Sequence, residues 1–343
     1  MTSASIIRKG ARLPALPTIR DIIKLYRLRA IKQLSQNFLM DERLTDKIVK
    51  AAGKIENQHV LEVGPGPGCI TRSIIKKMPQ KLIVVEKDRR FLPSLELLAE
   101  STAEYTKMDI YEGDILKFPI ETAFPDLKMH HWEGRRAPVH LIGNLPFSIS
   151  TRLLINWLRD VSLQQGAWKF GRATMTLTFQ KEVAERIVAP MASPQRCRLS
   201  IMSQIWTEPQ LKFTIPGKAF IPKPKVDVGV VQLVPYQIPL TKLPFDLVEK
   251  VCRYIFSMRQ KYLRRGISNL YPEDLRDELT YRTFQMADLN PETRSFLLSV
   301  DECLRIAEAY HHFSKIYPNI DSYNYRASKK IIHANYDEFD ESY

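Results

Sequence analysis

The sequence lacks the features that would mark a membrane protein, a metalloprotein or a disulfide-rich protein. Its 343 residues contain no run of 18 apolar residues, so no membrane span and no membrane partner are predicted. The four cysteines are isolated and form no CxxC pair, and the seven histidines show no metal-ligand spacing. We therefore predict no metal site, no disulfide framework and a reduced compartment.

Acidic residues are absent from the first twenty residues, MTSASIIRKGARLPALPTIR, which contain four basic residues. An N-terminus that is rich in arginine and hydroxyl groups and poor in acids is typical of a mitochondrial transit peptide. We predict that residues 1–27 have this role and that the protein acts in the mitochondrial matrix. The alternative is a basic arm that stays on the chain and contacts RNA.

The overall charge is strongly positive. Lys and Arg number 51 and Asp and Glu 38, which gives a formal net charge of +13. A surplus of this size favours a polyanionic partner, with nucleic acid as the first candidate. The alternative is a soluble protein that is merely basic. The one-sided charge and a single predicted catalytic unit favour a monomer.

Short apolar segments alternate with helical patterns through the first two thirds of the chain. Strands are predicted at 60–63, 81–86, 108–111, 139–143, 174–179, 211–215 and 226–234. Helices are predicted at 41–52, 68–77, 91–99, 151–158 and 181–188, and residues 190–198 are expected to form a basic loop. This alternation predicts an α/β fold, with a parallel sheet covered by helices on both faces.

The strand pattern ends at Pro235, and the helical pattern that follows is interrupted by Pro272 and Pro291. We predict a catalytic domain over 28–236 and a smaller α-helical, RNA-binding domain over 237–330. The acidic residues 331–343 are expected to be a disordered tail.

A glycine loop, EVGPGPG, follows the first predicted strand. Its glycines are Gly64, Gly66 and Gly68, and the last position of a dinucleotide GxGxxG pattern is Cys69. Such a loop between strand and helix lets backbone N–H groups approach a ligand closely. The spacing favours S-adenosylmethionine, a nucleoside with an amino-acid tail, over a pyrophosphate. An NAD-dependent oxidoreductase is therefore disfavoured.

Polar side chains follow the next strands at the same edge of the predicted sheet. Glu86 ends the second strand, where an acid can accept the ribose hydroxyls of a nucleoside. Asp114 ends the third and could accept from the exocyclic amine of adenine. Glu62 precedes the glycine loop, and Asn144 follows the fourth strand. All of these lie where ligands bind in such sheets.

The segment Asn144-Leu145-Pro146-Phe147 has the composition of a site for an amine nucleophile. The N6 lone pair of adenine is delocalised into the ring, so this amine needs acceptors for its protons. The side-chain oxygen of Asn144 and the carbonyl of Leu145 could be those acceptors. Pro146 restricts Leu145 to extended geometry, and Phe147 offers a stacking face worth about 1–3 kcal/mol.

The combined motifs resemble those of the rRNA adenine N6,N6-dimethyltransferases, and most closely the mitochondrial branch of that family. They cover roughly residues 30–235 and are QLSQNFL, VLEVGPGPG, VVEKD, EGD, IGNLPF, LTFQKEVAERI and IPGKAFIPKPKVDVGVV. The resemblance implies a Rossmann-like, class I S-adenosylmethionine-dependent methyltransferase sheet. The sequence departs from the bacterial pattern at Phe147, where Tyr is usual, and at Asp227, where Ser is common.

The resemblance also implies roles for individual residues. Gln36, Asn37 and Leu39 would cover the methionine end of the cofactor. Phe220 would flank the target base. Cofactor contacts are implied at Gly64, Glu86, Lys87, Asp114, Ile115 and Asn144.

The activity implied by the resemblance is dimethylation of two adjacent adenines. They would lie in a hairpin near the 3′ end of mitochondrial small-subunit rRNA, and the reaction would support assembly of the small ribosomal subunit. The alternative is a nucleic-acid-binding factor on the same fold that serves the mitochondrial transcription machinery on DNA. The intact glycine loop, acids and Asn144 motif favour the enzyme.

The stretch from 251 to 270 is predicted to bind RNA. It contains no acid, and aromatic residues interleave with its cations, which are Arg253, Arg259, Lys261, Arg264 and Arg265. On a continuous helix, Val251, Tyr254, Ile255 and Met258 would face the core and the cations would face the RNA backbone. The alternative is an ordinary solvated helix face.

Overall fold

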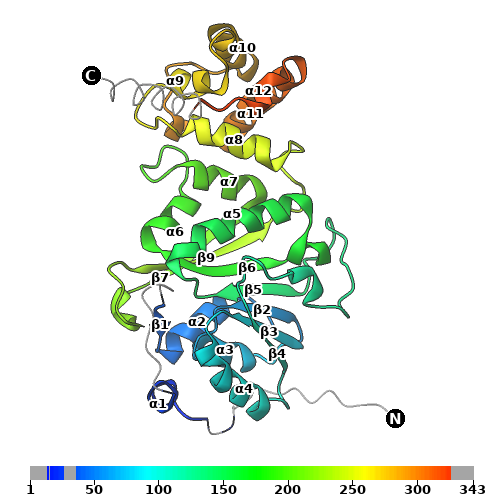
Figure 1. Ribbon diagram of the computed structural model, residues 1–343, viewed down its shortest axis with the longest axis vertical. Coiled ribbons are helices and arrows are strands. Elements are labelled where there is room, and N and C mark those ends of the chain that lie inside the picture. Colours follow the sequence, from blue (N-terminus) through cyan, green and yellow to red (C-terminus); the bar gives the residue numbers. More distant parts are fainter. Residues whose placement is uncertain (1–13, 15, 27–35, 326–343) are drawn as a thin grey trace, which may run out of the picture. The chain divides into compact units, whose positions relative to one another are not determined.

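The computed structural model describes residue 14 and residues 16–26 and 36–325. The predicted acidic tail lies outside these residues, and so does most of the predicted transit peptide. The exception is helix α1 (Ile19–Leu25), which is capped by Thr18 and Asp21. The chain forms two compact units (Figure 1). The first contains the residues up to Val188 together with Trp206–Ile238, and the second contains Ala189–Ile205 and the residues from Pro239 onward.

The first unit is built on a seven-stranded sheet with the order β4-β3-β2-β5-β6-β9-β7. Six strands run parallel, and β9 pairs antiparallel with both of its neighbours. The strands are β2 (His59–Val63), β3 (Lys81–Glu86), β4 (Lys107–Glu112), β5 (Val139–Gly143), β6 (Thr174–Gln180), β7 (Thr207–Ile215) and β9 (Val228–Pro235). The predicted α/β fold is confirmed. The reversed direction of β9 was not predicted, because the hydrophobicity pattern of a strand does not indicate its direction.

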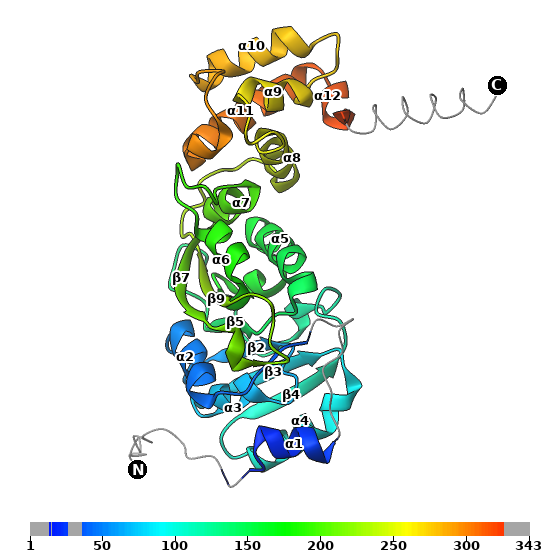
Figure 2. The same ribbon diagram turned by 90° about the vertical axis from the view of Figure 1, so that its left-hand side faces the viewer.

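The central strands are short and buried along their whole length because both sheet faces are covered. Every residue of β2 and β5 is buried, as expected for parallel strands between helical layers. Helices α2, α3 and α4 lie on one face and α5 and α6 on the other (Figures 1 and 2). These helices are α2 (Glu42–Ala52), α3 (Cys69–Ile75), α4 (Leu92–Ser101), α5 (Phe147–Leu163) and α6 (Lys181–Val188).

Two of these helices show how local sequence sets the ends. Asp41 caps α2 by accepting from the Arg43 N–H, and Gly53 ends that helix at a φ of 98°. Helix α5 is longer at both ends than the predicted 151–158. Pro146 occupies its N-cap position, so the helix begins directly at Phe147.

A second, two-stranded sheet pairs β1 (Phe38–Leu39) with β8 (Phe220–Ile221) in antiparallel register. It ties the segment before α2 to the proline-rich segment before β9. Strands of two residues carry no periodic pattern, so the sequence did not predict them.

The second unit is helical. Its helices are α7 (Arg198–Trp206, whose last residue belongs to the first unit), α8 (Phe245–Ile255), α9 (Leu263–Ile267), α10 (Arg276–Ala287), α11 (Val300–Ile316) and α12 (Asn319–Ser322). The segment 189–205 joins this unit, although the sequence prediction placed it in the catalytic domain. Arg196, expected in a basic loop, is 2% exposed and donates to the carbonyls of Leu298 and Ala189 at 2.8 and 2.9 Å. The bond to Leu298 joins the segment to the rest of this unit, as do the Ala192 N–H, which donates to the Phe296 carbonyl, and the ion pair of Arg198 with Glu249.

Candidate active site

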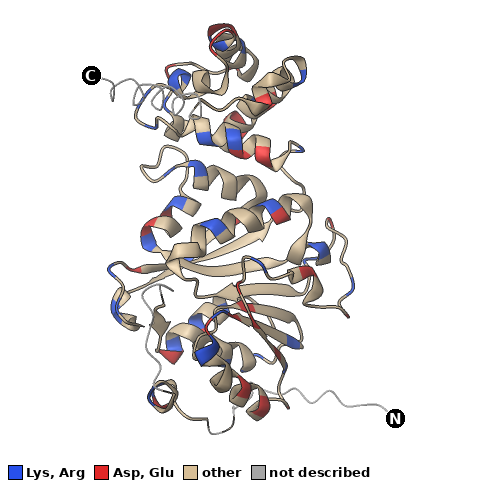
Figure 3. Cartoon of the chain, in the orientation of Figure 1, with Lys and Arg blue, Asp and Glu red and all other residues tan. Residues whose placement is uncertain are grey.

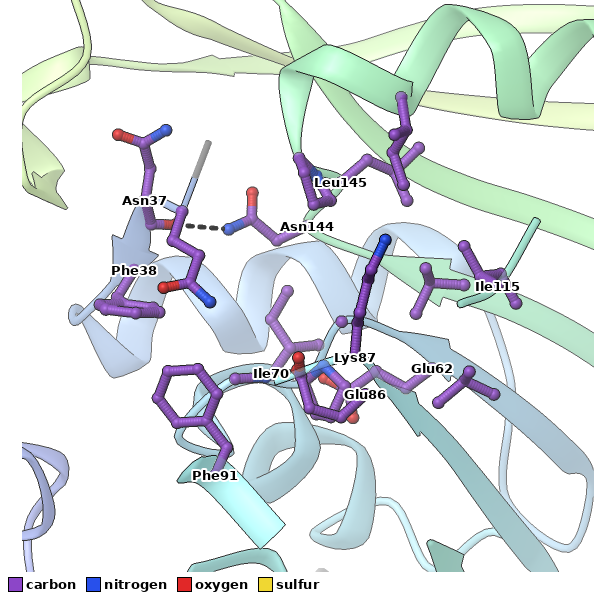
Figure 4. A pocket seen from close by; sticks show the side chains of 18 of the residues that line it. Asn37, Phe38, Glu62, Ile70, Glu86, Lys87, Phe91, Ile115, Asn144 and Leu145 are labelled. Carbon is purple, nitrogen blue, oxygen red and sulfur yellow. Dashed lines mark hydrogen bonds between the residues drawn. The ribbon is translucent and has the colours of Figure 1, made fainter. Parts of the chain in front are cut away.

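A pocket opens at the carboxyl ends of β2, β3, β4 and β5, and we call it the strand-end pocket (Figure 4). The turns after these strands and the segment around β1 line it. The predicted site residues that line it are Gln36, Asn37, Leu39, Glu62, Gly64, Gly66, Glu86, Lys87, Asp114, Ile115, Asn144, Leu145, Pro146 and Phe147. They come from distant parts of the sequence, and the parallel sheet gathers them at one edge.

The glycine loop provides a side-chain-free wall. Gly64 and Gly66 have φ angles of 62° and 55°, a left-handed region that favours glycine. The Gly66 N–H donates to Oε2 of Glu86 at 2.9 Å. Gly68, which was predicted to contact a cofactor, does not line the pocket. It precedes α3 at a φ of 90°, and a Cβ there would lie 3.3 Å from Leu98.

Glu86 joins two turns of the pocket. Besides the Gly66 N–H, its carboxylate accepts the Asp88 N–H at 2.8 Å through Oε1. Burial raises the pKa of Glu86, while the hydrogen bonds from the backbone at Asp88 and Gly66 oppose that rise. Each carboxylate oxygen has a second lone pair. Glu86 can therefore hold the glycine loop and accept hydroxyl donors at the same time.

Glu62 is a buried acid without a full set of partners. It is 1% exposed, and its Oε2 has no hydrogen-bond partner among the described residues. Burial raises its pKa to about 8, and the neighbouring Thr71 opposes the rise. Glu62 is therefore largely protonated at neutral pH, and a cationic group bound beside Oε2 would favour its ionised form.

The raised pKa of Glu62 predicts a pH dependence of stability. Between its ordinary pKa of 4.5 and about 8 the unfolded state is ionised and the folded state is not. Wild-type stability should therefore fall over that range relative to Glu62→Gln, by up to about 1.4 kcal/mol per pH unit. Urea denaturation of both proteins from pH 5 to 8 checks this. Stability curves that stay parallel would contradict the assigned pKa.

Lys87 and Asp114 form an ion pair on another side of the pocket. The Nζ of Lys87 lies 2.9 Å from Oδ2 of Asp114, and Oδ1 accepts the Leu116 N–H at 3.0 Å. The hydrogen bond from Lys87 holds the pKa of Asp114 below its ordinary value. Asp114 is thus an ionised acceptor.

The side chain of Asn144 is fixed in place by two contacts. Its Nδ2 donates to the carbonyl of Asn37 at 2.9 Å, drawn as a dashed line in Figure 4. Its Oδ1 accepts from the hydroxyl of Thr178 at 2.8 Å. The Leu145 N–H donates to the same hydroxyl oxygen at 3.2 Å. Thr178, a fully buried residue of β6, therefore orients both Asn144 and the peptide that follows it.

Thr178 was not predicted as a site residue. It lies in a strand whose first six residues are all buried, so no alternation distinguishes it from core. Thr178→Val removes the hydroxyl and leaves the Leu145 N–H without its acceptor. We expect kcat for methyl transfer to fall about tenfold, with Thr178→Ser retaining most of it, because a lost hydrogen bond costs about 0.5–1.5 kcal/mol. Single-turnover kinetics with saturating cofactor measures this, and equal losses in both variants would contradict a positioning role.

The segment before α2 closes one side of the pocket. Gln36 donates through Nε2 to Oδ2 of Asp88 at 2.8 Å, which ties this segment to the turn after β3. The rings of Phe38 and Phe91 meet edge to face at 5.5 Å and stand together in Figure 4. Neither Phe was predicted, because a single aromatic residue at an element end is indistinguishable from core. Residues 33–35 of the QLSQNFL motif lie outside the described residues.

Phe220 does not fit the role that was expected for it. Its side chain is 2% exposed and belongs to the same buried cluster as Phe38 and Leu39. It pairs with Leu39 across the small sheet and does not line the pocket. A ring buried in this way has no free face for a base, so the prediction that Phe220 flanks the target adenine is wrong for this conformation.

The predicted RNA-binding stretch lies in the second unit and is not one helix. Helix α8 ends at Ile255 and α9 begins at Leu263. Met258 lies between them and is exposed, so the prediction that it faces the core is wrong. Arg253 lies 3.4 Å from Glu249, which precedes the acid-free stretch. Figure 3 shows both signs of charge on α8. Lys261, Arg264 and Arg265 are exposed, and Arg259 is half-buried.

The described residues contain neither a membrane-spanning helix nor a metal-binding cluster. No helix in the described parts of the chain is both long and apolar enough to cross a membrane. Residues 16–26 and 36–325 also contain no group of three His, Cys, Asp or Glu side chains that could hold a metal ion.

Comparison with known proteins decides the family. Residues 27–311 match the ribosomal RNA adenine dimethylase family. The chain belongs to that family. The predicted enzyme, an rRNA adenine dimethyltransferase that uses S-adenosylmethionine, is confirmed by this membership, and the rRNA substrate follows from it.

Individual relatives cover nearly the whole chain. It is 60% identical over 329 residues to a Drosophila pseudoobscura pseudoobscura protein named "Dimethyladenosine transferase 1, mitochondrial", with 95% of each chain covered. It is 50% identical to the Homo sapiens protein of that name, covering 93% of this chain and 92% of the other. These names support the prediction of a mitochondrial protein.

Among solved structures, a dimethyladenosine transferase from Plasmodium falciparum superposes with a TM-score of 0.60 at 21% identity. It covers 80% of this chain and 98% of its own. The 23S rRNA methyltransferase ErmE gives a TM-score of 0.56 at 19% identity, with 80% and 99% covered. At such identities the likeness concerns the fold, and it confirms the predicted class I methyltransferase sheet.

Proposed function

We propose that this enzyme transfers methyl groups to the N6 amines of two adjacent adenines in a hairpin near the 3′ end of mitochondrial small-subunit rRNA. The observation that carries the proposal is the fixed Asn144-Leu145-Pro146-Phe147 segment, which lines the same pocket as the glycine loop and Glu86. An amine acceptor beside a nucleoside site is the arrangement that adenine methylation needs.

The residues of the strand-end pocket fit S-adenosylmethionine. The left-handed glycines leave room for close approach, and the unpartnered Oε2 of Glu62 could accept from an ammonium group, whose charge would favour the ionised form of this acid. Glu86 would accept the ribose hydroxyls, and Asp114 would accept from the adenine amine. Gln36, Asn37 and Leu39 would cover the methionine end. When bound, the cofactor supplies an electrophilic methyl group on a sulfonium.

Asn144 would orient the target amine. One lone pair of its Oδ1 accepts from Thr178, and the second is available for an N6 proton. The carbonyl of Leu145 would accept the other proton, because Pro146, with φ −58° and ψ 127°, limits the peptide before it to extended geometry. Half-buried Phe147 would stack on the base. No general base is required, because the amine proton can leave after transfer.

The proposed setting is the mitochondrial matrix, with a monomeric enzyme acting on the rRNA of an assembling small ribosomal subunit. The mitochondrial names of the relatives support the organelle. The alternative role in mitochondrial transcription would use the positive charge of the chain to bind DNA and would not need the strand-end pocket. The pocket, with its glycine loop, Glu86 and Asn144 together, favours catalysis as the main role.

The proposal is tested with synthetic hairpins that carry the adenine pair or have either adenine replaced by guanosine. Transfer from labelled S-adenosylmethionine should fall by about half when one adenine is replaced and vanish when both are. Full transfer to the hairpin that lacks both adenines would overturn the assigned target. No transfer to any hairpin, from a protein that binds cofactor and RNA, would leave the assembling subunit as the substrate to test next.

A further inference from the structure

A second hollow in the first unit lies at the opposite ends of the strands from the strand-end pocket. Its volume is about 740 Å³, and it lies where α2 ends and β5 and β6 begin, beside β7 and β9. Five exposed cations line it and no Asp or Glu does. They are Lys47, Lys50, Lys54, Arg136 and Lys212. We call it the basic hollow.

The described residues do not neutralise the charge of the basic hollow. Within the described residues no ion pair joins any of the five cations to a carboxylate. Lys47 lies 4.2 Å above the ring of Phe213, and Lys212 donates to Oε1 of Gln210. In the second unit, by contrast, Arg253 and Arg282 each lie within 4 Å of a glutamate one helical turn away.

The remaining lining of the hollow is uncharged and mixes apolar with polar residues. The C-terminal end of α2 carries partial negative charge on its last carbonyls. Nε2 of Gln232 donates to two of these, those of Ala51 and Ala52, at 3.0 and 3.3 Å. His140 pairs through Nε2 with Oε1 of Gln58 at 2.6 Å. Burial, with Arg136 nearby, lowers the pKa of His140 to about 4, so it is neutral at physiological pH. The cations therefore set the potential of the hollow.

We propose that the basic hollow binds the phosphate backbone of an rRNA segment outside the hairpin that enters the strand-end pocket. A hollow that is lined by several unpaired cations and by no carboxylate can bind neighbouring phosphates of one RNA strand. The class of RNA rests on the proposed function. The hollow itself is independent of the chemistry at Asn144.

The sheet separates the two sites. Strand β5 begins beside the hollow, where His140 lies, and ends just before Asn144, about 13 Å further along at the rise of an extended chain. The two sites lie at opposite ends of the strands, so an RNA that fills both must pass around the sheet. This geometry favours a flanking segment of the substrate over the short target hairpin.

The test compares two triple variants that remove the same charge. Lys50→Gln/Lys54→Gln/Arg136→Gln changes the hollow. Lys77→Gln/Lys107→Gln/Lys128→Gln changes exposed lysines of the same unit that line neither site. Affinity is measured over a range of salt for the target hairpin alone and for a longer rRNA fragment that includes the flanking helices. S-adenosylmethionine binding reports that each variant is folded.

The hollow variant should bind the longer fragment at least about tenfold more weakly, and its plot of log affinity against log salt should be shallower by about two to three. Its affinity for the hairpin should match that of the control variant. Equal losses in both variants, or an equal loss for hairpin and longer fragment, would overturn the proposal. Methyl transfer by the wild type is scored separately, so failure of the proposed function and failure of the basic hollow give different results.

Discussion

Asn144→Ala should lower the rate of methyl transfer by about 100- to 1,000-fold, the range seen when one preorganised polar group is removed from an active site. The variant loses the Oδ1 that would accept an N6 proton and the Nδ2 that binds the Asn37 carbonyl at 2.9 Å. It also leaves the Thr178 hydroxyl without its acceptor. Single-turnover transfer from labelled cofactor to the hairpin measures the loss.

The Asn144 variant needs a control for cofactor binding, because its side chain also lines the pocket. Its affinity for S-adenosylhomocysteine, measured by calorimetry, should change far less than its rate. Asn156→Ala, which changes an exposed asparagine of α5 outside the strand-end pocket, should retain wild-type activity. If Asn144→Ala transferred methyl groups at the wild-type rate, the assigned role of the motif would be wrong.

Glu86→Ala should weaken S-adenosylmethionine binding by about 100-fold or more. The variant loses the acceptor of the Gly66 and Asp88 N–H groups, so the glycine loop and the turn after β3 lose their common anchor. It also loses the expected acceptor of the ribose hydroxyls. Hydrogen bonds to a charged group contribute about 1.5–3 kcal/mol each, and about 1.4 kcal/mol is a factor of ten in affinity.

Calorimetric titration with S-adenosylmethionine measures the effect of Glu86→Ala. Glu96→Ala, an exposed acid on α4, is the matched control and should bind the cofactor as the wild type does. Glu86→Gln keeps one carbonyl oxygen and should fall between the two. An unchanged dissociation constant for Glu86→Ala would show that the cofactor does not use this edge of the sheet.

The parts of the site that the sequence predicted are those that follow from strand order. Glu86, Asp114 and Asn144 each stand at or just after the end of a predicted strand, and parallel strands bring their carboxyl ends to one edge of the sheet. The glycine spacing then indicated the ligand, and the NLPF motif indicated the reaction. The fold supports this reasoning, because the predicted residues of these turns line one pocket.

Other features depend on tertiary contacts that a single sequence does not encode locally. Thr178 acts through a hydrogen bond to a residue 34 positions earlier in the chain. Phe220 was assigned to the target base by resemblance, but its position in a two-residue strand buries it. Met258 was placed on a helix face by periodicity, although α8 ends before it.

The buried Arg196 is the clearest case of a misleading composition. A basic residue in a loop is usually solvated, yet this guanidinium is 2% exposed and is satisfied by two backbone carbonyls and Oε1 of Gln204. Its partners are 7, 8 and 102 residues away in sequence. The bond to Leu298 is one of the contacts that join residues 189–205 to the helical unit, although strands of the sheet flank this segment in sequence.

Product analysis after transfer by the wild-type enzyme identifies the atom that receives the methyl groups. The target hairpin is incubated with S-adenosylmethionine labelled in its methyl group, digested to nucleosides and separated by mass. N6,N6-dimethyladenosine should be the main labelled product. Label found only in another nucleoside, or on the ribose, would contradict the assignment of Asn144 and Leu145 to an adenine N6 amine.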